Sequence, residues 1–321
     1  MKRIFLTGLL VAATSFLWAQ QAEEVFRPEE AGRILRTLAS DEMRGRKIFT
    51  PEIEQAADFI ASEFKAAGLE PLANNGSFRQ EFSLVRNKQE VKGQKMANVV
   101  GVLPGKSLKN EFVIFSGHYD HIGVGRPVNG DSIYNGANDD AAGITAVILL
   151  ARYFKAMNNN ERTLVFAAFT GEESGGLGSR YFSQQFNSDQ VMAMFNIEMI
   201  GTDSKWGKNS AYITGYEKTD MGEILSHDLE GSGFTFYPDP YPTQQLFYRS
   251  DNATFARKGV PAHTISTSKM DVEPFYHKPG DEIETLDMEN MAAVIKAIGL
   301  SAQSIITGKK TPSRVKTDEL R

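Results

Sequence analysis

Three short apolar runs in this chain each lead into side chains that can bind a metal ion. Residues 112–116, 164–169 and 192–197 are built almost wholly from Val, Ile, Leu, Met, Phe and Ala. Continuous runs of this length are typical of strands that helices cover on both faces of a sheet. The groups that follow these runs include His118, the pair Glu172 and Glu173, and Glu198. Because functional residues of open α/β sheets collect at the carboxyl ends of strands, these side chains are expected to meet at one edge.

Amphipathic helices are predicted between these strands. Residues 51–67 repeat apolar side chains at helical spacing and stop at Gly68, and residues 141–157 form a helix with a long apolar run. That run is too short to cross a bilayer. Alternating strands and helices predict an α/β fold, a three-layer αβα sandwich around a central mixed, mostly parallel sheet. A chain of 321 residues that is 41% apolar and 23% charged fits one large globular domain.

The two ends of the chain differ from its middle. Two basic residues precede an almost wholly apolar stretch over residues 4–18, which is the pattern of a secretory signal peptide over residues 1–20. An uncleaved N-terminal anchor is the alternative. Export to a periplasm or to the medium is therefore expected, with one folded domain over residues 21–307. The segment 308–321 is polar and highly charged, lacks an apolar period and is expected to be mobile.

The chain contains no Cys, and its formal net charge is -5. Removal of the signal peptide would take away its two basic residues and change the charge from -5 to -7. Such a chain has no general attraction to nucleic acid or to an anionic membrane, and no integral membrane segment is expected after signal removal. Without Cys there are no disulfides. Any metal site must therefore use His and carboxylates.

Two pairs of residues suggest ligands and groups that support them. Asp120 lies two residues after His118 and is placed to accept the ring proton of a metal-bound imidazole, although a solvated surface loop has the same pattern. Asp139 and Asp140 follow a turn rich in Gly and Asn and precede a helix, where carboxylates also serve as caps. Asp120 and Asp140 are expected to contact the metal ligands without binding the metal ions themselves.

The remaining candidates lie farther along the chain. Of the adjacent acids Glu172 and Glu173, one can bind a metal ion while the other takes a proton from a metal-bound water. An ordinary acidic loop would show the same sequence pattern. Glu198 ends an apolar strand, where an unpaired carboxylate is costly to bury, so a cation partner is favoured. His277 follows Pro-Phe-Tyr in a loop. Two other histidines are expected to be structural or solvated, His227 and His263.

The order of these motifs resembles the two-zinc exopeptidases, a family of secreted bacterial aminopeptidases and glutamate carboxypeptidases with a phosphorylase/hydrolase-like fold. The similarity covers roughly residues 27–306. Its main segments are GHYDHIG at 117–123, GANDDAAG at 136–143 and FTGEESGGLGS at 169–179. Shorter matches follow in the same order at residues 196–201, 249–251 and 276–277.

The resemblance implies a role for each matched residue. Two zinc ions would be bound by His118, Asp139, Glu173, Glu198 and His277, with Asp139 bridging both, His118 and Glu198 completing one site, and Glu173 and His277 the other. Glu172 would act as the general base, and Tyr276 would help to stabilise the oxyanion. Arg249 would line the substrate pocket. The peptide bond between Asp139 and Asp140 would be cis.

Two positions depart from the family. Glu198 stands where Asp is usual, and Asn252 stands where His is frequent. A carboxylate of either length can bind zinc, so Glu198 is still expected to be a ligand. The metal affinity or preference of that site could differ.

The family resemblance predicts a secreted zinc peptidase that cleaves terminal peptide bonds of a peptide or a dipeptide-like substrate. The compact chain favours an aminopeptidase, by analogy. Two alternatives are a glutaminyl cyclase of the same fold with a single zinc, and a catalytically inactive relative that binds peptides or proteins. Five aromatic side chains could either form the wall of a substrate pocket or be ordinary packing residues. They are Trp206, Phe236, Tyr237, Tyr241 and Phe247.

Overall fold

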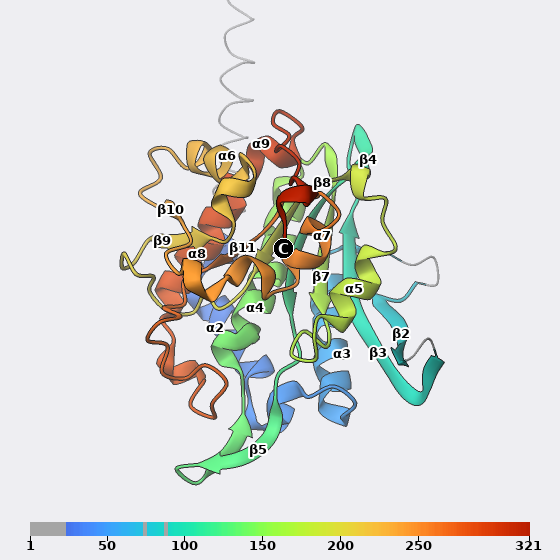
Figure 1. Ribbon diagram of the computed structural model, residues 1–321, viewed down its shortest axis with the longest axis vertical. Coiled ribbons are helices and arrows are strands. Elements are labelled where there is room, and N and C mark those ends of the chain that lie inside the picture. The colour runs from blue at the N-terminus through green and yellow to red at the C-terminus, as the bar shows by residue number, and fades with distance from the viewer. Residues whose placement is uncertain (1–23, 73–75, 87–88) are drawn as a thin grey trace, which may run out of the picture.

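The computed structural model describes residues 24–72, 76–86 and 89–321. The signal peptide expected at residues 1–20 lies outside them. The described chain forms a central mixed sheet with helices on both faces (Figure 1), as the alternating pattern predicted. The strands are β1 (Glu70–Pro71), β2 (Arg79–Arg86), β3 (Gln89–Leu103), β4 (Leu108–His118), β5 (Gly123–Val128), β6 (Asp131–Tyr134), β7 (Arg162–Phe169), β8 (Val191–Ile197), β9 (Ser210–Ile213), β10 (Thr235–Pro238) and β11 (Ala262–Ser266).

The main sheet is parallel at its centre. Its strand order is β1-β3-β7-β4-β8-β11-β9-β10, and β2 also pairs with β3. Strands β7, β4, β8 and β11 run parallel to one another, whereas β3 is antiparallel to β7 and β9 is antiparallel to β11. Every residue of β7 is buried, which explains its continuous apolar run, since both of its faces are covered.

Helices cover the two faces unequally. The helices are α2 (Pro28–Leu38), α3 (Pro51–Ala66), α4 (Ala142–Met157), α5 (Leu177–Ser183), α6 (Met221–Asp228), α7 (Asn252–Ala256), α8 (Met288–Ser301) and α9 (Gln303–Ile306). The larger core cluster joins one sheet face to α2, α3, α4, α6 and α8. The smaller cluster joins the other face to α5 and α7. No helix in the described part of the chain is long and apolar enough to span a membrane.

Single turns of helix connect these elements. They are η1 (Glu24–Phe26), η2 (Asp41–Arg46), η3 (Ala137–Ala141), η4 (Ser188–Gln190), η5 (Tyr216–Lys218), η6 (Pro242–Gln244), η7 (Leu246–Tyr248), η8 (Ile283–Thr285) and η9 (Thr317–Glu319). Of these, η3 places Asp139 directly before α4.

The hairpin of β5 and β6 projects from the body of the protein (Figure 1) and has no counterpart in the sequence-based expectations. After Gly123, the other residues of β5 are exposed. The two strands are held by pairing with each other, so neither has a buried face that would produce an apolar period.

The C-terminal segment 308–321 packs on the body of the protein. The guanidinium of Arg314 donates a hydrogen bond to the Val191 carbonyl at 2.8 Å. Val315 is 4% exposed, and its amide donates to the Gly259 carbonyl. This differs from the mobile tail that the composition predicted, because scattered apolar side chains such as Val315 and hydrogen bonds to the body of the protein hold the segment without making a periodic pattern.

Candidate active site

The parallel centre of the sheet brings the ends of three strands to one edge. His118 is the last residue of β4 and lies beside Phe169, the last residue of β7. Glu172 and Glu173 follow shortly after β7, and Glu198 comes immediately after β8. The strand ends therefore deliver these side chains to the same place, as their order in the sequence predicted.

Two further candidate ligands reach this edge from outside the sheet. Asp139 belongs to η3 and is 2% exposed. His277 lies in the loop between β11 and α8, and its side chain is 38% exposed. The five residues expected to bind metal are thus brought together from five separate segments.

The first cluster contains His118, Asp139 and Glu198, whose potential ligand atoms lie within 4.8 Å of one another. His118 Nδ1 is 3.1 Å from the Asp120 carbonyl oxygen, which can only accept a hydrogen bond, so Nδ1 carries the proton. The other nitrogen, Nε2, lies 3.2 Å from Asp139 Oδ1 but makes no hydrogen bond. The ring therefore turns its lone pair towards a carboxylate, an arrangement that a cation between the two would stabilise.

The second cluster uses the other oxygen of Asp139. His277 Nε2 is 3.3 Å from Asp139 Oδ2 and 3.2 Å from Glu173 Oε2. His121 also lies here, with Nδ1 2.9 Å from Glu173 Oε1. The ligand atoms of a tetrahedral zinc ion stand about 3.3–3.5 Å apart, given zinc–ligand distances of about 2.0–2.2 Å. The separations from His118 to Asp139 and from His277 to Asp139 and Glu173 lie close to this range, and Asp139 directs one oxygen towards each cluster.

Glu198 is held at the first cluster by hydrogen bonds from β8 and a neighbouring loop. The Ser250 hydroxyl donates to Glu198 Oε2, and Asn196 Nδ2 donates to that hydroxyl at 2.7 Å. Burial raises the pKa of Glu198 to about 7. A bound cation would oppose this effect, so the longer side chain at this position still fits a metal ligand.

The side-chain carboxylate of Asp140 joins three parts of the site by accepting hydrogen bonds from backbone amides. The peptide bond between Asp139 and Asp140 is cis. The Asp140 carboxylate accepts hydrogen bonds from the amides of His118 at 3.1 Å, Gly143 at 3.0 Å and Met199 at 3.2 Å. A Cβ atom at Gly143 would lie 2.4 Å from Asp140 Oδ2, so only glycine allows the helix to approach this closely.

Asp120 supports the site in a different way from the expected one. Its carboxylate is 3.8 Å from His118 Nδ1, while its own backbone carbonyl takes the ring proton. Asp120 Oδ1 instead accepts a hydrogen bond from the Glu172 amide at 3.1 Å. The sequence could not distinguish these two uses, because both place an acceptor two residues after His118.

Asp120→Ala is expected to lower kcat by about 10–100-fold while zinc content stays at the parent value, because the Glu172 backbone loses its anchor. Asp120→Asn keeps an acceptor oxygen and should recover most of the rate. Peptidase assays with metal analysis of both variants test this. An Ala variant with the parent kcat, or an Asn variant as slow as Ala, would remove Asp120 from this positioning role.

Asp281 and Arg46 hold the turn before α4 and were not predicted from the sequence. Asp281 accepts hydrogen bonds from the amides of Asn138 at 2.8 Å and Asp139 at 3.0 Å. Arg46 is fully buried and donates to the Gly136 carbonyl at 3.0 Å. Its other acceptors are the carbonyls of Leu38, Tyr119 and Asn135. No local pattern marks either residue, since their partners lie far along the chain.

Glu172 is free of both ligand clusters. Burial raises the pKa of Glu172 well above its ordinary value, and the carboxylates of Glu198 and Asp251 raise it further. Beside it lies a cavity of about 310 Å³ whose polar lining includes Glu172, Arg180, Arg249 and others. The side chain is therefore next to space that a substrate could occupy, as a general base must be.

Tyr276 and Arg249 stand together at the opening of the site. Arg249 Nη2 donates a hydrogen bond to the Tyr276 hydroxyl oxygen at 3.4 Å. The Tyr276 ring stacks on the His277 ring, with 3.9 Å between their centroids. Both residues line a small cavity of about 40 Å³ that Glu198 also lines. Arg249 thus lines a small cavity next to the first candidate ligand cluster.

The five aromatic residues considered for a pocket wall lie outside the cavities at the candidate site. Trp206 stacks on Tyr237, with centroids 4.1 Å apart, and Phe247 belongs to the smaller core cluster. Among the described residues, none of the five lines the cavities that contain Glu172, Glu198 or His277.

The other two histidines have ordinary partners. Both nitrogens of the buried His263 ring are satisfied, Nε2 by the Thr219 hydroxyl at 2.7 Å and Nδ1 by the Thr214 carbonyl at 2.8 Å. His227 is exposed and contacts Glu230. Asn252 hydrogen-bonds to backbone carbonyls and to Thr264, and belongs to neither cluster.

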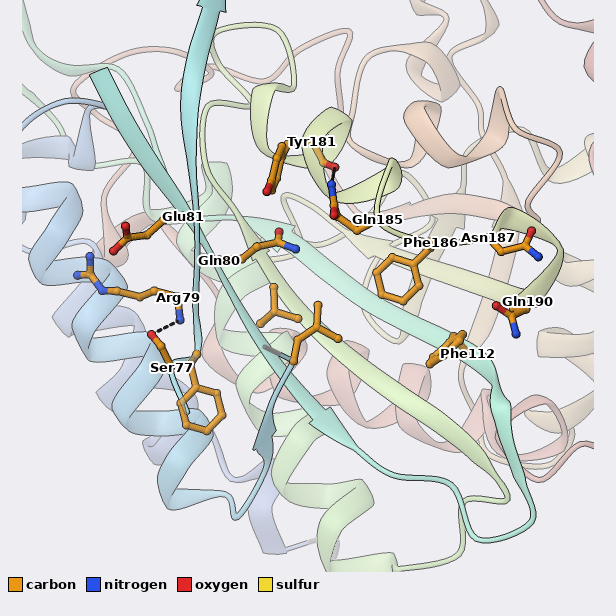
Figure 2. A pocket seen from close by; sticks show the side chains of 13 residues that line it. Ser77, Arg79, Gln80, Glu81, Phe112, Tyr181, Gln185, Phe186, Asn187 and Gln190 are labelled. Carbon is orange, nitrogen blue, oxygen red and sulfur yellow. Dashed lines mark hydrogen bonds between the residues drawn. The ribbon is translucent and has the colours of Figure 1, made fainter. Parts of the chain in front are cut away.

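A larger cavity of about 730 Å³ is lined by residues of β2, β3, β4 and α5 (Figure 2). Arg79, Gln80 and Tyr181 line one side of this cavity, and the rings of Phe112 and Phe186 line the other. None of the candidate ligands or Glu172 is among the described residues that line it. Its size alone therefore does not make it the reactive site.

Comparison with known sequences finds that the chain is similar to proteins named as aminopeptidases. A probable leucine aminopeptidase of Trichophyton verrucosum is 30% identical over 203 residues, covering 60% of this chain and 53% of the relative. Aminopeptidase YwaD of Bacillus subtilis is 22% identical over 240 residues, covering 70% of this chain and 48% of the relative. The chain thus spans about half the length of the curated relatives it matches.

Comparison with solved structures shows the fold. A zinc aminopeptidase from Bacillus subtilis superposes with a TM-score of 0.71 at 15% identity, covering 89% of this chain and 97% of that one. The glutaminyl cyclase of Porphyromonas gingivalis reaches 0.68 at 15% identity, covering 88% and 99%. The model of peptidase family M28 matches residues 98–301, which is well over half of the chain and includes both ligand clusters. The chain belongs to peptidase family M28.

Proposed function

We propose that this protein is an aminopeptidase that uses two zinc ions and Glu172 as its general base. The observation that carries the proposal is that Asp139 directs one carboxylate oxygen into each ligand cluster, with Glu172 beside them. Membership of the family supports cleavage of peptide bonds. The relatives named leucine aminopeptidase support release of an amino-terminal residue.

The chain's own residues then have the following roles. Bound zinc ions would polarise the scissile carbonyl group and lower the pKa of a water molecule. The Glu172 carboxylate takes a proton from the attacking water and returns it to the nitrogen of the leaving amine. The Tyr276 hydroxyl donates to the oxyanion that develops on the carbonyl oxygen. Because Arg249 donates to the same hydroxyl oxygen, it leaves the hydroxyl proton free to point at that oxyanion.

A second candidate function is cleavage at a free carboxyl end. Arg180, Arg249 and Arg257 all line the cavity of about 310 Å³ next to Glu172. Guanidinium groups in that position could bind a substrate carboxylate. The same wall could also receive the carboxyl end of a dipeptide whose amino-terminal residue is released.

The deciding experiment compares three substrates with zinc present and after chelation. Leucine p-nitroanilide has a free amine and no carboxylate, N-acetylated dipeptides have only the carboxylate, and free dipeptides have both. We expect hydrolysis of the anilide and the free dipeptides, lost on chelation. Hydrolysis of the N-acetylated dipeptides alone would replace the aminopeptidase by the second candidate.

Two other candidate functions, a glutaminyl cyclase and an inactive binding protein, are tested by the reaction products and by the metal content. A glutaminyl cyclase would release ammonia from peptides that begin with Gln, whereas the proposed enzyme releases a free amino acid. A catalytically inactive binding relative would hold fewer than one cation per chain, whereas about two are expected from the two clusters. Metal analysis of the purified protein separates these outcomes.

Tyr276→Phe is expected to lower kcat by about 100-fold with little change in KM, because a donor that acts only on the developing oxyanion is removed. Steady-state kinetics on leucine p-nitroanilide measure the effect. Tyr237→Phe, whose ring stacks on Trp206 outside the cavities at the candidate site, is the matched control and should stay near the parent rate. Equal effects of the two changes would count against an oxyanion role for Tyr276.

The proposed reaction takes place outside the cytoplasm. The basic and apolar pattern of residues 1–20 supports export, and the lack of Cys makes the fold independent of disulfide formation. Fractionation of cells that express the full chain, with amino-terminal sequencing of the exported protein, tests export and cleavage together. Retention of residues 1–20 in a membrane fraction would favour an anchor.

A further inference from the structure

We propose that His121 is a fourth protein ligand at the second cluster, so that protein groups close this metal position while the first position stays open. The inference rests on the two-metal centre of the proposed function. Its consequence is a difference in affinity: the position with four protein ligands binds zinc more tightly and fills first. The substrate and the water would then be handled at the position formed by His118, Asp139 and Glu198.

The first observation is that His121 is a buried imidazole without hydrogen bonds. It is 1% exposed, and neither ring nitrogen has a hydrogen-bond partner among the described residues. Leaving such groups unsatisfied in the interior costs about 1–3 kcal/mol each. His263 is equally buried, yet both of its nitrogens are paired. By contrast, the polar groups nearest the His121 ring are the carboxylates of Glu173 and Asp139, an arrangement that a cation between them would stabilise.

The second observation is where the ring points. His121 Nδ1 lies 2.9 Å from Glu173 Oε1 and 3.9 Å from Asp139 Oδ2, distances on either side of the about 3.3–3.5 Å expected between ligands of one zinc ion. These three residues form the second group whose ligand atoms lie within 4.8 Å of one another. Glu173 Oε1 is itself without a hydrogen bond, so the short contact lacks hydrogen-bond geometry.

The third observation is that His121 and His277 approach the same carboxylates from different sides. His277 contacts Glu173 through Oε2, whereas His121 contacts Oε1. The two rings meet edge to face with centroids 5.9 Å apart, and His277 is the exposed one of the pair. Two imidazoles and two carboxylates make a full tetrahedral set, as in metal sites where protein groups fill all four coordination places.

The His121 ring is also fixed in place. Its backbone amide donates to the Arg46 carbonyl, and its ring lies against Gly136. A Cβ atom at Gly136 would stand 2.5 Å from His121 Cγ. The ring therefore has little freedom to turn away, and a preorganised ligand loses little entropy when it binds.

Among the described residues, the group of potential ligands at the first position is His118, Asp139 and Glu198, whereas His277 adds a fourth candidate to the three at the second position. Three protein ligands and one free place are the arrangement of catalytic zinc sites, which need that place for water or substrate. The two positions therefore differ in the number of protein ligands, four against three, although they share Asp139.

The test is a zinc titration of the full chain against a competing chelator, which yields two dissociation constants. For the parent protein we expect the two constants to differ by at least about 10-fold. His121→Ser should weaken the tighter constant by about 100-fold or more and the weaker one by less than about threefold. His227→Ser, which removes an exposed imidazole on α6, is the matched control and should change neither.

A second variant and a second readout protect the test against misfolding. His121→Asp retains a ligating group and should recover part of the lost affinity. With one equivalent of Co²⁺, the parent's visible spectrum should be that of a tetrahedral site and should change in His121→Ser but not in His227→Ser. Unchanged constants in a folded His121→Ser would overturn the proposal, and so would two equal constants in the parent.

Failure of this inference and failure of the proposed function give different results. If the parent shows the two constants and the His121 effect but cleaves no peptide, the fourth ligand stands and the aminopeptidase proposal falls. If the parent cleaves leucine p-nitroanilide but His121→Ser binds zinc as the parent does, the reverse holds. In that case His121 is only an ion-pair partner of Glu173.

Discussion

Glu172→Gln is expected to lower kcat by about three orders of magnitude, within the roughly 10²–10⁴-fold range of general acid–base catalysis. Gln has almost the same shape as Glu but cannot accept the proton of the attacking water. Glu172 belongs to neither ligand cluster, so about two zinc ions per chain should remain bound. Kinetics on leucine p-nitroanilide and metal analysis of the same preparation measure both quantities.

The matched control for Glu172 is its neighbour. Glu173→Gln changes the same chemical group one residue later, but Glu173 contacts His121 and His277 in the second cluster. This variant should lose rate together with zinc, whereas Glu172→Gln loses rate alone. A Glu172→Gln enzyme within tenfold of the parent kcat would show that another group takes the proton.

The strand ends of the site could be predicted from the sequence because burial leaves a local record. A strand covered on both faces is a continuous apolar run, as in residues 164–169, and the polar residue after it must lie at the edge of the sheet. The parallel register of the strands then brings these residues together, since it places His118 of β4 beside the end of β7. The fold and the convergence of His118, Glu172 and Glu198 follow from this single rule.

The supporting groups could not be predicted because their partners are distant. Arg46 satisfies carbonyls that lie about ninety residues further along the chain, in the turn before α4. Asp281 fixes the amide of Asp139, which lies 142 residues earlier in the chain. Such contacts follow from the folded path of the chain and leave no periodicity. His121 was visible in the strand-end motif, but only its orientation towards Glu173 suggests a ligand.

The sequence also cannot tell which of two acceptors of Asp120, its carboxylate or its backbone carbonyl, takes the ring proton of His118. The sequence places a carboxylate two residues after His118, and both the carboxylate and the backbone carbonyl of Asp120 can reach the ring. In the structure, the carbonyl takes the ring proton, which leaves the carboxylate to hold Glu172. Backbone conformation decides between them, and neither residue type nor spacing encodes it.

A concentration of buried carboxylates at the site has a consequence for stability. Asp120, Asp139, Asp140 and Asp251 are each at most 2% exposed, and Glu198 lies beside them. Like charges in the interior repel one another and lose solvation, so bound cations should stabilise the fold strongly. A ligand that binds only the folded state adds about 4 kcal/mol of stability at a thousandfold excess over its dissociation constant.

Asp139→Ala is therefore expected to abolish tight binding of both zinc ions, because this carboxylate supplies one oxygen to each cluster. The parent should show a Tm that rises on zinc addition and falls on chelation, whereas the variant's Tm should respond to neither. Differential scanning calorimetry and metal analysis measure the two effects, with Asp318→Ala, which changes an exposed aspartate far from the clusters in sequence, as the control. Loss of one ion with retention of the other would mean that Asp139 serves a single position. In that case the paired contacts of its oxygens with His118 and His277 would not reflect a bridge.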